Sequence, residues 1–173
     1  NGFDRGLVGH VSMEPKEFAE CGGQLLQLCP WISRISLHGD LDEFPRSPHW
    51  ARIAAVQIAG SASPDWISTA LASDGGFKRL VEFDLWEADV SEDDLRLLST
   101  APAMASLQKL GLSECGLNAR RLKILFSGQP LPDLKTLRLL LNPFDDEGMT
   151  SLARWHGVRT VEDLDVDECG IGP

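Results

Sequence analysis

The sequence predicts an α/β fold in which short strands and helices alternate along a right-handed solenoid with a curved parallel sheet. The first observation behind this prediction is a fixed period in the apolar residues. A pattern with apolar residues at its first, fourth and sixth positions starts at Ile53, Leu80, Leu107, Leu134 and Val161, each 27 residues after the last. Another copy starts at Ile32, 21 residues before Ile53. Such a period is typical of stacked repeats, which bury their apolar faces against their neighbours.

The second observation is that the other half of each repeat carries a helical apolar stripe. Leucines recur at one phase, at Leu71, Leu98, Leu125 and Leu152. Two further rows are Leu95, Leu122 and Met149, and Val90, Leu117 and Phe144. We therefore expect a helix to return the chain to the next strand, through right-handed connections that make neighbouring strands parallel.

Residue types at fixed repeat positions carry a family resemblance. The segments LQKLGLSECGL from Leu107 and VEDLDVDECGI from Val161 both fit the form L-x-x-L-x-L-x-x-N/C-x-L, and Asn142 holds the N/C position between them. Over residues 32–173 the chain resembles the leucine-rich repeat superfamily, and its repeat length is most similar to the ribonuclease-inhibitor-like branch. The repeat region and the opening NGFDRGLVGHV are similar to bacterial, planctomycete-type repeat-companion proteins.

Residues 1–31 lie outside the period and are predicted to form an N-terminal cap on the first repeat. We expect a strand over residues 6–11 and an amphipathic helix over residues 15–28, begun by a proline that the first turn tolerates. The apolar face of this helix is assigned to Phe18, Leu25, Leu26 and Leu28. Terminal repeats generally need such a cover for their open core.

Two repeats depart from the pattern. Residues 32–52 leave room for only a short helix or turn, in a segment broken by Pro45 and Pro48. The repeat from Ile53 has polar residues and a proline at its N/C position and at the expected start of its helix, namely Ser61, Ser63 and Pro64. In the helix itself, Ser68 stands where other repeats have leucine. We expect looser packing here, partly offset by Trp66 and Ile67.

Composition narrows the class of partner. The chain has 16 Lys and Arg against 26 Asp and Glu, a formal charge of −10, which disfavours nucleic acid and favours a basic protein. No apolar run is long enough to span a membrane, so no membrane partner is expected. Cysteines without a disulfide, zinc or redox pattern favour a reduced, cytoplasmic setting. The chain starts without Met and ends where another helix would begin, so we expect it to be part of a longer protein.

The cysteines and histidines do not predict catalysis or metal binding. Cys115 and Cys169 share the N/C position two repeats apart, about 9–10 Å at the usual strand spacing, which is too far for a disulfide, so buried thiols are expected. Cys21 and Cys29 match neither a zinc pair nor a redox motif. The segment 111–115 lacks the final glycine of a nucleophile elbow. We expect no enzymatic activity, cofactor or metal.

The register also predicts a binding surface on the concave side of the sheet, made by strand residues between the core positions. Trp86 is a large aromatic residue at such a position, and carboxylates cluster beside it at Glu82, Asp84 and Glu87 and again over residues 163–168. An aromatic residue among charges is typical of interface hot spots. The predicted partner-binding residues are Glu82, Asp84, Trp86, Glu87, Lys109, Glu114, Arg138, Leu140, Asp163, Asp165 and Asp167.

The leading functional hypothesis is therefore a module that binds a protein or peptide through this mostly acidic concave face. The acidic character is similar, in sign only, to the surface that ribonuclease inhibitors offer to basic enzymes. Two alternatives remain open: a spacer or scaffold for a catalytic or effector domain outside this sequence, and a domain that regulates such an enzyme in cis. The sequence does not predict the oligomeric state.

Overall fold

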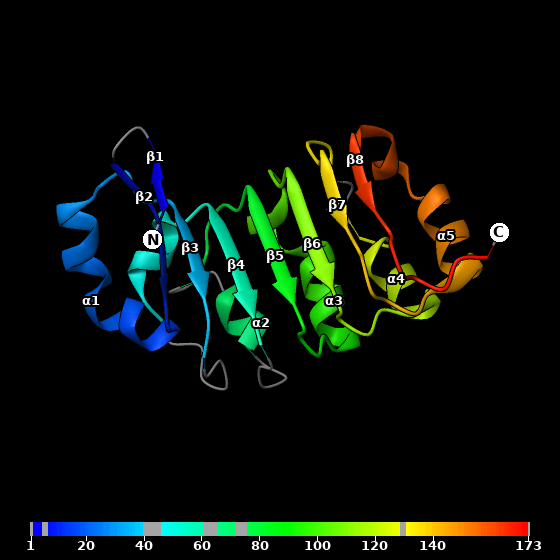
Figure 1. Ribbon diagram of the computed structural model, residues 1–173, viewed down its shortest axis with the longest axis horizontal. Coiled ribbons are helices and arrows are strands. Elements are labelled where there is room, and N and C mark those ends of the chain that lie inside the picture. Colours follow the sequence, from blue (N-terminus) through cyan, green and yellow to red (C-terminus); the bar gives the residue numbers. More distant parts are fainter. Residues whose placement is uncertain are drawn as a thin grey trace.

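The chain forms a mixed α/β structure with one layer of strands and one layer of helices (Figure 1). The computed structural model describes residues 2–4, 7–39, 46–60, 66–71, 76–128 and 131–172. Within these residues eight strands form a single sheet in chain order, from β1 to β8. β1 pairs antiparallel with β2, and β2 to β8 are parallel. This arrangement is compatible with an α/β solenoid.

The strands follow the predicted period. Their bounds are β1 Gly2–Asp4, β2 Leu7–Met13, β3 Arg34–Leu37, β4 Ala55–Ala59, β5 Glu82–Trp86, β6 Lys109–Ser113, β7 Thr136–Arg138 and β8 Asp163–Asp165. From β4 onward each strand begins 27 residues after the previous one. From β4 onward neighbouring strands pair without a shift in register, so Phe83 lies beside Leu110 and Leu110 beside Leu137. Equivalent residues therefore stand in rows across the sheet.

Helices connect the strands and cover one face of the sheet. The α-helices are α1 Pro15–Leu28, α2 Trp66–Ala70, α3 Glu92–Thr100, α4 Ala119–Leu125 and α5 Asp145–Arg154; the 3-10 helices are η1 Pro48–Arg52, η2 Pro102–Met104 and η3 His156–Thr160. Side chains cap the starts of several helices; for example, Ser91 and Asp94 form a capping box at α3, and Asn118 accepts from the Arg121 amide at α4.

The core lies between the sheet and the helices, as the apolar pattern predicts. In the repeats that begin at Leu80, Leu107 and Leu134, all three pattern residues are buried. The last repeat differs, because Leu164 is 41% exposed and Val161 and Val166 are only partly buried. β8 pairs with β7 alone in the described chain, so its apolar row is covered from one side.

Each strand from β4 onward ends in a turn with a left-handed residue. The residues with positive φ at this position are Gly60, Glu87, Glu114, Leu141 and Glu168. Left-handed backbone is unfavourable for residues other than glycine. A hydrogen bond to the next repeat accompanies the turn, since the amide of Glu87 donates to the carbonyl of Ser113 (3.1 Å) and that of Glu114 to Leu140 (3.0 Å). The turn therefore extends the pairing between repeats beyond the strands.

A polar ladder continues this pairing under the turns. The Asn142 side chain is fully buried and accepts hydrogen bonds from the amides of Cys115 (3.1 Å) and Leu117 (2.9 Å). It also donates to the Leu112 carbonyl at 2.7 Å. One repeat later the Cys169 thiol donates to the equivalent carbonyl, that of Leu139, at 3.1 Å. The predicted burial of Cys115 and Cys169 is confirmed, and the structure pairs neither of them in a disulfide.

The N-terminal helix α1 has the predicted bounds, and one of its face assignments is wrong. Phe18 and Leu26 are buried and Leu25 is partly buried, but Leu28 is 77% exposed. Residues two apart on a helix point to nearly opposite sides, so Leu28 cannot share a face with Leu26. The strand β2 runs to Met13, beyond its predicted end, and β1 was not predicted.

The irregular repeats are filled by aromatic side chains. The predicted short helix is η1, and its Trp50 lies 4.4 Å from Phe18 and 5.5 Å from Phe77, measured between ring centroids. All three are buried, as are Trp66 and Ile67 in α2. In the described part of this region the large rings therefore occupy the space for which loose packing was expected. Pro45, Ser61, Ser63 and Pro64 lie outside the described residues.

Candidate functional site

The sheet face that the helices leave uncovered, called the open face here, carries the predicted surface residues in rows. Side chains alternate between the two faces of a strand, so Glu82, Asp84 and Trp86 point away from the core that holds Phe83 and Leu85. One row across the sheet is Arg34, Ala55, Glu82, Lys109, Thr136 and Asp163. The next is Ser36, Gln57, Asp84, Gly111, Arg138 and Asp165. Figure 1 shows these strands in front of the helices.

Two ion pairs neutralise most of the first predicted acidic cluster. Glu82 pairs with Arg34 at 2.5 Å, across the small, buried Ala55 that stands between them in the register. Asp84 pairs with Lys109 at 2.6 Å, and their side chains are only 15% and 19% exposed. Both cations lie on other strands. The open face is therefore less acidic around β5 than the list of its carboxylates suggests.

The Asp84 carboxylate occupies the space above Gly111. A Cβ atom placed on Gly111 would overlap this carboxylate. Gly111 is directly opposite Asp84 in the register, on the strand that also carries Lys109. The absence of a side chain at Gly111 thus lets the carboxylate lie flat on β6 and reach its cation.

A hydrogen-bonded polar row extends the open face over β2, β3 and β4. His10 Nε2 and Ser36 Oγ are 2.7 Å apart, and the Ser36 hydroxyl donates to Gln57 Oε1 at 3.0 Å. Because that hydroxyl proton is used on Gln57, His10 must donate through its Nε2 proton. Burial lowers the pKa of His10, and the nearby Arg34 adds to this effect. The ring is therefore neutral at neutral pH.

A pocket of about 340 Å³ lies on the open face beside Trp86. It forms because β4 presents the small Ala59 next to the large indole of Trp86 on β5. Trp86 is 39% exposed, and its Nε1 proton donates to Glu87 Oε1 at 3.2 Å, which holds the edge of the ring. The polar residues that line the pocket are Ser12, Ser36, His38, Gln57 and Asp84. The predicted exposure of Trp86 is thus confirmed, with a cavity beside it.

The second acidic cluster, at β8, is not neutralised by ion pairs with the described residues, although Arg138 stands beside Asp165 in the register. Asp163, Asp165 and Asp167 make no ion pair with any described residue. Three strand spacings, about 14 Å, separate this cluster on β8 from Trp86 on β5. Arg138 lies between them, exposed and likewise unpaired within the described chain.

The remaining predicted residues lie at the ends of the strands. Glu87 and Glu114 are exposed at their left-handed turns. Leu140 is partly buried, so it contributes less apolar surface than expected. Ser113, which the register also places on this face, is 1% exposed.

Sequence analysis missed the contribution of β2. His10 and Ser12 join the open face because β2 pairs in parallel with β3, which places His10 beside Arg34 and Ser12 beside Ser36. The repeat period could not find them, because β2 lies outside it. The available signal for these residues was the alternation of apolar and polar side chains near the end of residues 7–13. That alternation predicts a strand but does not show which strand lies beside it.

Among the described residues no group of three or more His, Cys, Asp or Glu is arranged to hold a metal ion. Burial raises the pKa of the Cys115 thiol to about 11, which keeps it protonated and unreactive at neutral pH.

Comparisons of the chain with models of protein families, with curated proteins and with solved structures gave no match.

Proposed function

We propose that this chain is a protein-interaction module of the leucine-rich repeat type, which binds an extended segment of a partner protein across the open face of its sheet. The observation that carries the proposal is the pocket beside Trp86, where an exposed indole forms one wall of a cavity of about 340 Å³. The repeated strand spacing and the Cys and Asn ladder support the repeat assignment.

The pocket suits an apolar side chain of the partner as an anchor. Trp86 supplies apolar area, and Ala59 leaves room beside it. Ser12 and Gln57, at the rim, supply groups that can hydrogen bond to the backbone of a bound segment. Buried aromatic contacts of this kind carry a large share of the binding energy at interfaces.

The charges on the open face predict that the partner segment also carries a basic residue. Glu82 and Asp84 are already paired, whereas Asp163, Asp165 and Asp167 form a cluster of carboxylates outside any ion pair with the described residues, and this cluster can attract a basic partner. An extended chain advances about 3.3 Å per residue, so the 14 Å between the two regions corresponds to about four residues. We therefore expect an apolar anchor followed or preceded, about four residues away, by Lys or Arg.

Selection from a random peptide library displayed on phage tests this proposal. Selected peptides should contain the apolar and basic residues at this spacing, and Trp86→Ala should weaken their binding at least about ten-fold, or roughly 1.4 kcal/mol. Trp31→Ala is the matched control, because Trp31 is 46% exposed and does not line the pocket. Association rates should fall as salt is raised, because the carboxylates steer a basic ligand.

Selected peptides that bind Trp86→Ala as tightly as the original chain would move the site elsewhere. Failure of the selection to enrich any peptide would favour the alternative of a spacer or scaffold. Circular dichroism of Trp86→Ala should match that of the original chain, because the indole lies outside the core.

The helices of the described chain fall short of the length and apolar character that crossing a lipid bilayer requires. Membrane spanning by these helices therefore plays no part in the proposal.

A further inference from the structure

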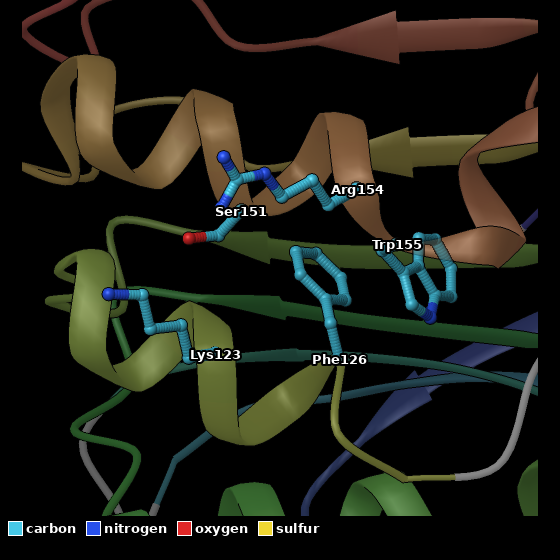
Figure 2. Close-up of a pocket in the computed structure, with 5 residues that line it drawn as sticks. All are labelled: Lys123, Phe126, Ser151, Arg154 and Trp155. Atoms are coloured by element: carbon cyan, nitrogen blue, oxygen red, sulfur yellow. The ribbon is translucent and has the colours of Figure 1, made fainter.

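A second pocket lies in the helix layer, between α4 and α5, and has a volume of about 310 Å³. Figure 2 shows the two helices side by side, with strands of the sheet behind them. Lys123 and Phe126 border it from α4 and the residue after its end, and Ser151 and Arg154 border it from α5. Each pair is three residues apart, so both members face the groove. Trp155, directly after α5, completes the lining.

The apolar part of this groove is a fixed pair of aromatic rings. Phe126 and Trp155 stack with centroids 4.6 Å apart and planes 21° apart. Trp155 is mostly buried, whereas Phe126 is partly exposed toward the groove. The indole also takes the space where Gly157 would carry a Cβ atom, so a side chain at Gly157 would move the ring. The stacked rings offer a ready surface to a third ring.

The polar part of the groove is positively charged. Arg154 is exposed and makes no hydrogen bond or ion pair with any described residue. Lys123 pairs with Glu147, but these side chains are 56% and 66% exposed. Such an exposed pair contributes little and can be exchanged for another carboxylate. In a chain of formal charge −10, this groove joins two cations to an aromatic surface.

The groove is not a by-product of the repeat. The equivalent positions between α3 and α4, 27 residues earlier, hold Arg96, Ser99, Ile124, Ser127 and Gly128. That set has one cation and no aromatic residue. Of these two grooves, only the one between α4 and α5 combines two cations with aromatic rings. Packing of the two helices does not require this combination.

We propose that the α4–α5 groove is a second binding site, which takes an acidic peptide segment with an aromatic residue next to a carboxylate. The aromatic side chain lies against Phe126, and the carboxylate pairs with Arg154 and Lys123. A peptide fits better than a free small molecule, because the groove opens to solvent between two helices and its volume is at the lower end for small-molecule sites. The site is separate from the open face, so it does not depend on the function proposed above.

Fluorescence anisotropy with a defined probe tests this site. The probe is a short fluorescein-labelled peptide in which phenylalanine and glutamate alternate, titrated with the intact chain. One control peptide has glutamine in place of glutamate, and another has alanine in place of phenylalanine. We expect the first probe to bind and both control peptides to bind at least about ten-fold more weakly, because each lacks one half of the recognition.

Variants of exposed residues locate the probe. Arg154→Gln should weaken binding about ten-fold, and Lys123→Gln should add to this loss. Arg159→Gln is the matched control, since it removes the same charge from an exposed arginine of η3 that does not line the groove. It should leave the affinity unchanged.

Equal losses for Arg154→Gln and Arg159→Gln would overturn the proposal in favour of unspecific attraction between charges. Equal affinity for the alanine control peptide would overturn the role of the aromatic surface, and absence of binding by the first probe would overturn the site. If a small aryl carboxylate displaced the probe as effectively as unlabelled peptide does, the ligand of the groove would be a small molecule and not a peptide. None of these outcomes bears on the open face.

Discussion

Asp84 illustrates how a surface carboxylate can depend on a residue without a side chain. It lies over Gly111 and pairs with Lys109, and both partners come from the neighbouring strand. Glycine within a strand usually costs stability relative to alanine because it loses more conformational freedom on folding. Here that cost is offset by a place for the carboxylate and its cation.

We predict that Gly111→Ala lowers the free energy of unfolding by about 1–2 kcal/mol, because the new methyl group displaces the Asp84 carboxylate. Urea denaturation followed by circular dichroism measures this change. In an Asp84→Ala background the same substitution should be neutral or stabilising, since the overlap is gone and alanine is the better strand residue. Equal costs in the two backgrounds would show that something other than the carboxylate occupies the space.

Cys115 is a buried thiol whose environment makes stability depend on pH. Burial raises its pKa from 9.0 to about 11, against a smaller opposing effect of a backbone hydrogen bond at Ala88. In the unfolded chain the thiol loses its proton at lower pH than in the folded chain. The contribution is therefore fully present below pH 9 and is lost as pH rises toward 11.

We predict that the free energy of unfolding falls by up to about 1.4 kcal/mol per pH unit between pH 9 and 11 through this one group. Cys115→Ala should remove this part of the slope, and alanine is a suitable replacement because Ala88 holds the equivalent position one repeat earlier. Cys21→Ala, at an exposed thiol, controls for the loss of a cysteine as such. Parallel pH profiles for the original chain and Cys115→Ala would contradict the assignment.

The elements of this structure are joined by polar contacts at the strand ends as well as by the core. The left-handed turns at Glu87 and Glu114 donate to the next repeat, and the side chain of Asn142 holds two amides and a carbonyl below them. Cysteine takes the same position in the repeats on either side, where its thiol can donate one hydrogen bond and its sulfur is a weak acceptor. This position thus accepts residues of different hydrogen-bonding capacity, including Ala88, whose side chain can make no hydrogen bond.

At Asn142 we predict that alanine lowers the free energy of unfolding by about 3–5 kcal/mol, because the amides of Cys115 and Leu117 lose their acceptor inside the protein. Asn142→Cys should cost clearly less, since its sulfur offers the amides a weak acceptor and its thiol can donate as that of Cys169 does. Thermal and urea unfolding of the two variants make the comparison. Equal destabilisation by alanine and cysteine would mean that the ladder hydrogen bonds do not distinguish them.

The whole molecule is a row of elements that contact mainly their neighbours. The central strands β5 and β6 have a strand on each side and fully buried core residues. The strand β8 pairs on one side and leaves Leu164 41% exposed. Local opening should therefore be easier near β8 than at β5 and β6.

Hydrogen–deuterium exchange measured by mass spectrometry checks this gradient. Peptides that contain β5 and β6 should exchange slowest, and the peptide that contains β8 should exchange faster by at least about ten-fold, because opening it exposes less buried surface. Similar protection in β8 and β6 would show that the sheet opens only as a unit.

Much of the fold follows from periodicity, whereas the candidate site follows from it only in part. Repeat phase places Trp86 on the open face, and alternation along a strand is a local property that a single sequence displays. It does not show that Glu82 would meet Arg34, which lies 48 residues earlier. Nor does it show that Leu28 points away from Leu26, which requires attention to the helical angle as well as to composition.

By itself the sequence determined the 27-residue period at which the strands from β4 onward recur, the helix at Pro15–Leu28 and the burial of Cys115 and Cys169. Only the tertiary structure decided which charges pair on the open face, where the pocket beside Trp86 lies and how the α4–α5 groove brings Arg154 to the stacked rings. The physical reason is that the direction of a side chain depends on its own backbone, whereas its partners depend on the register and packing of elements far away in the chain.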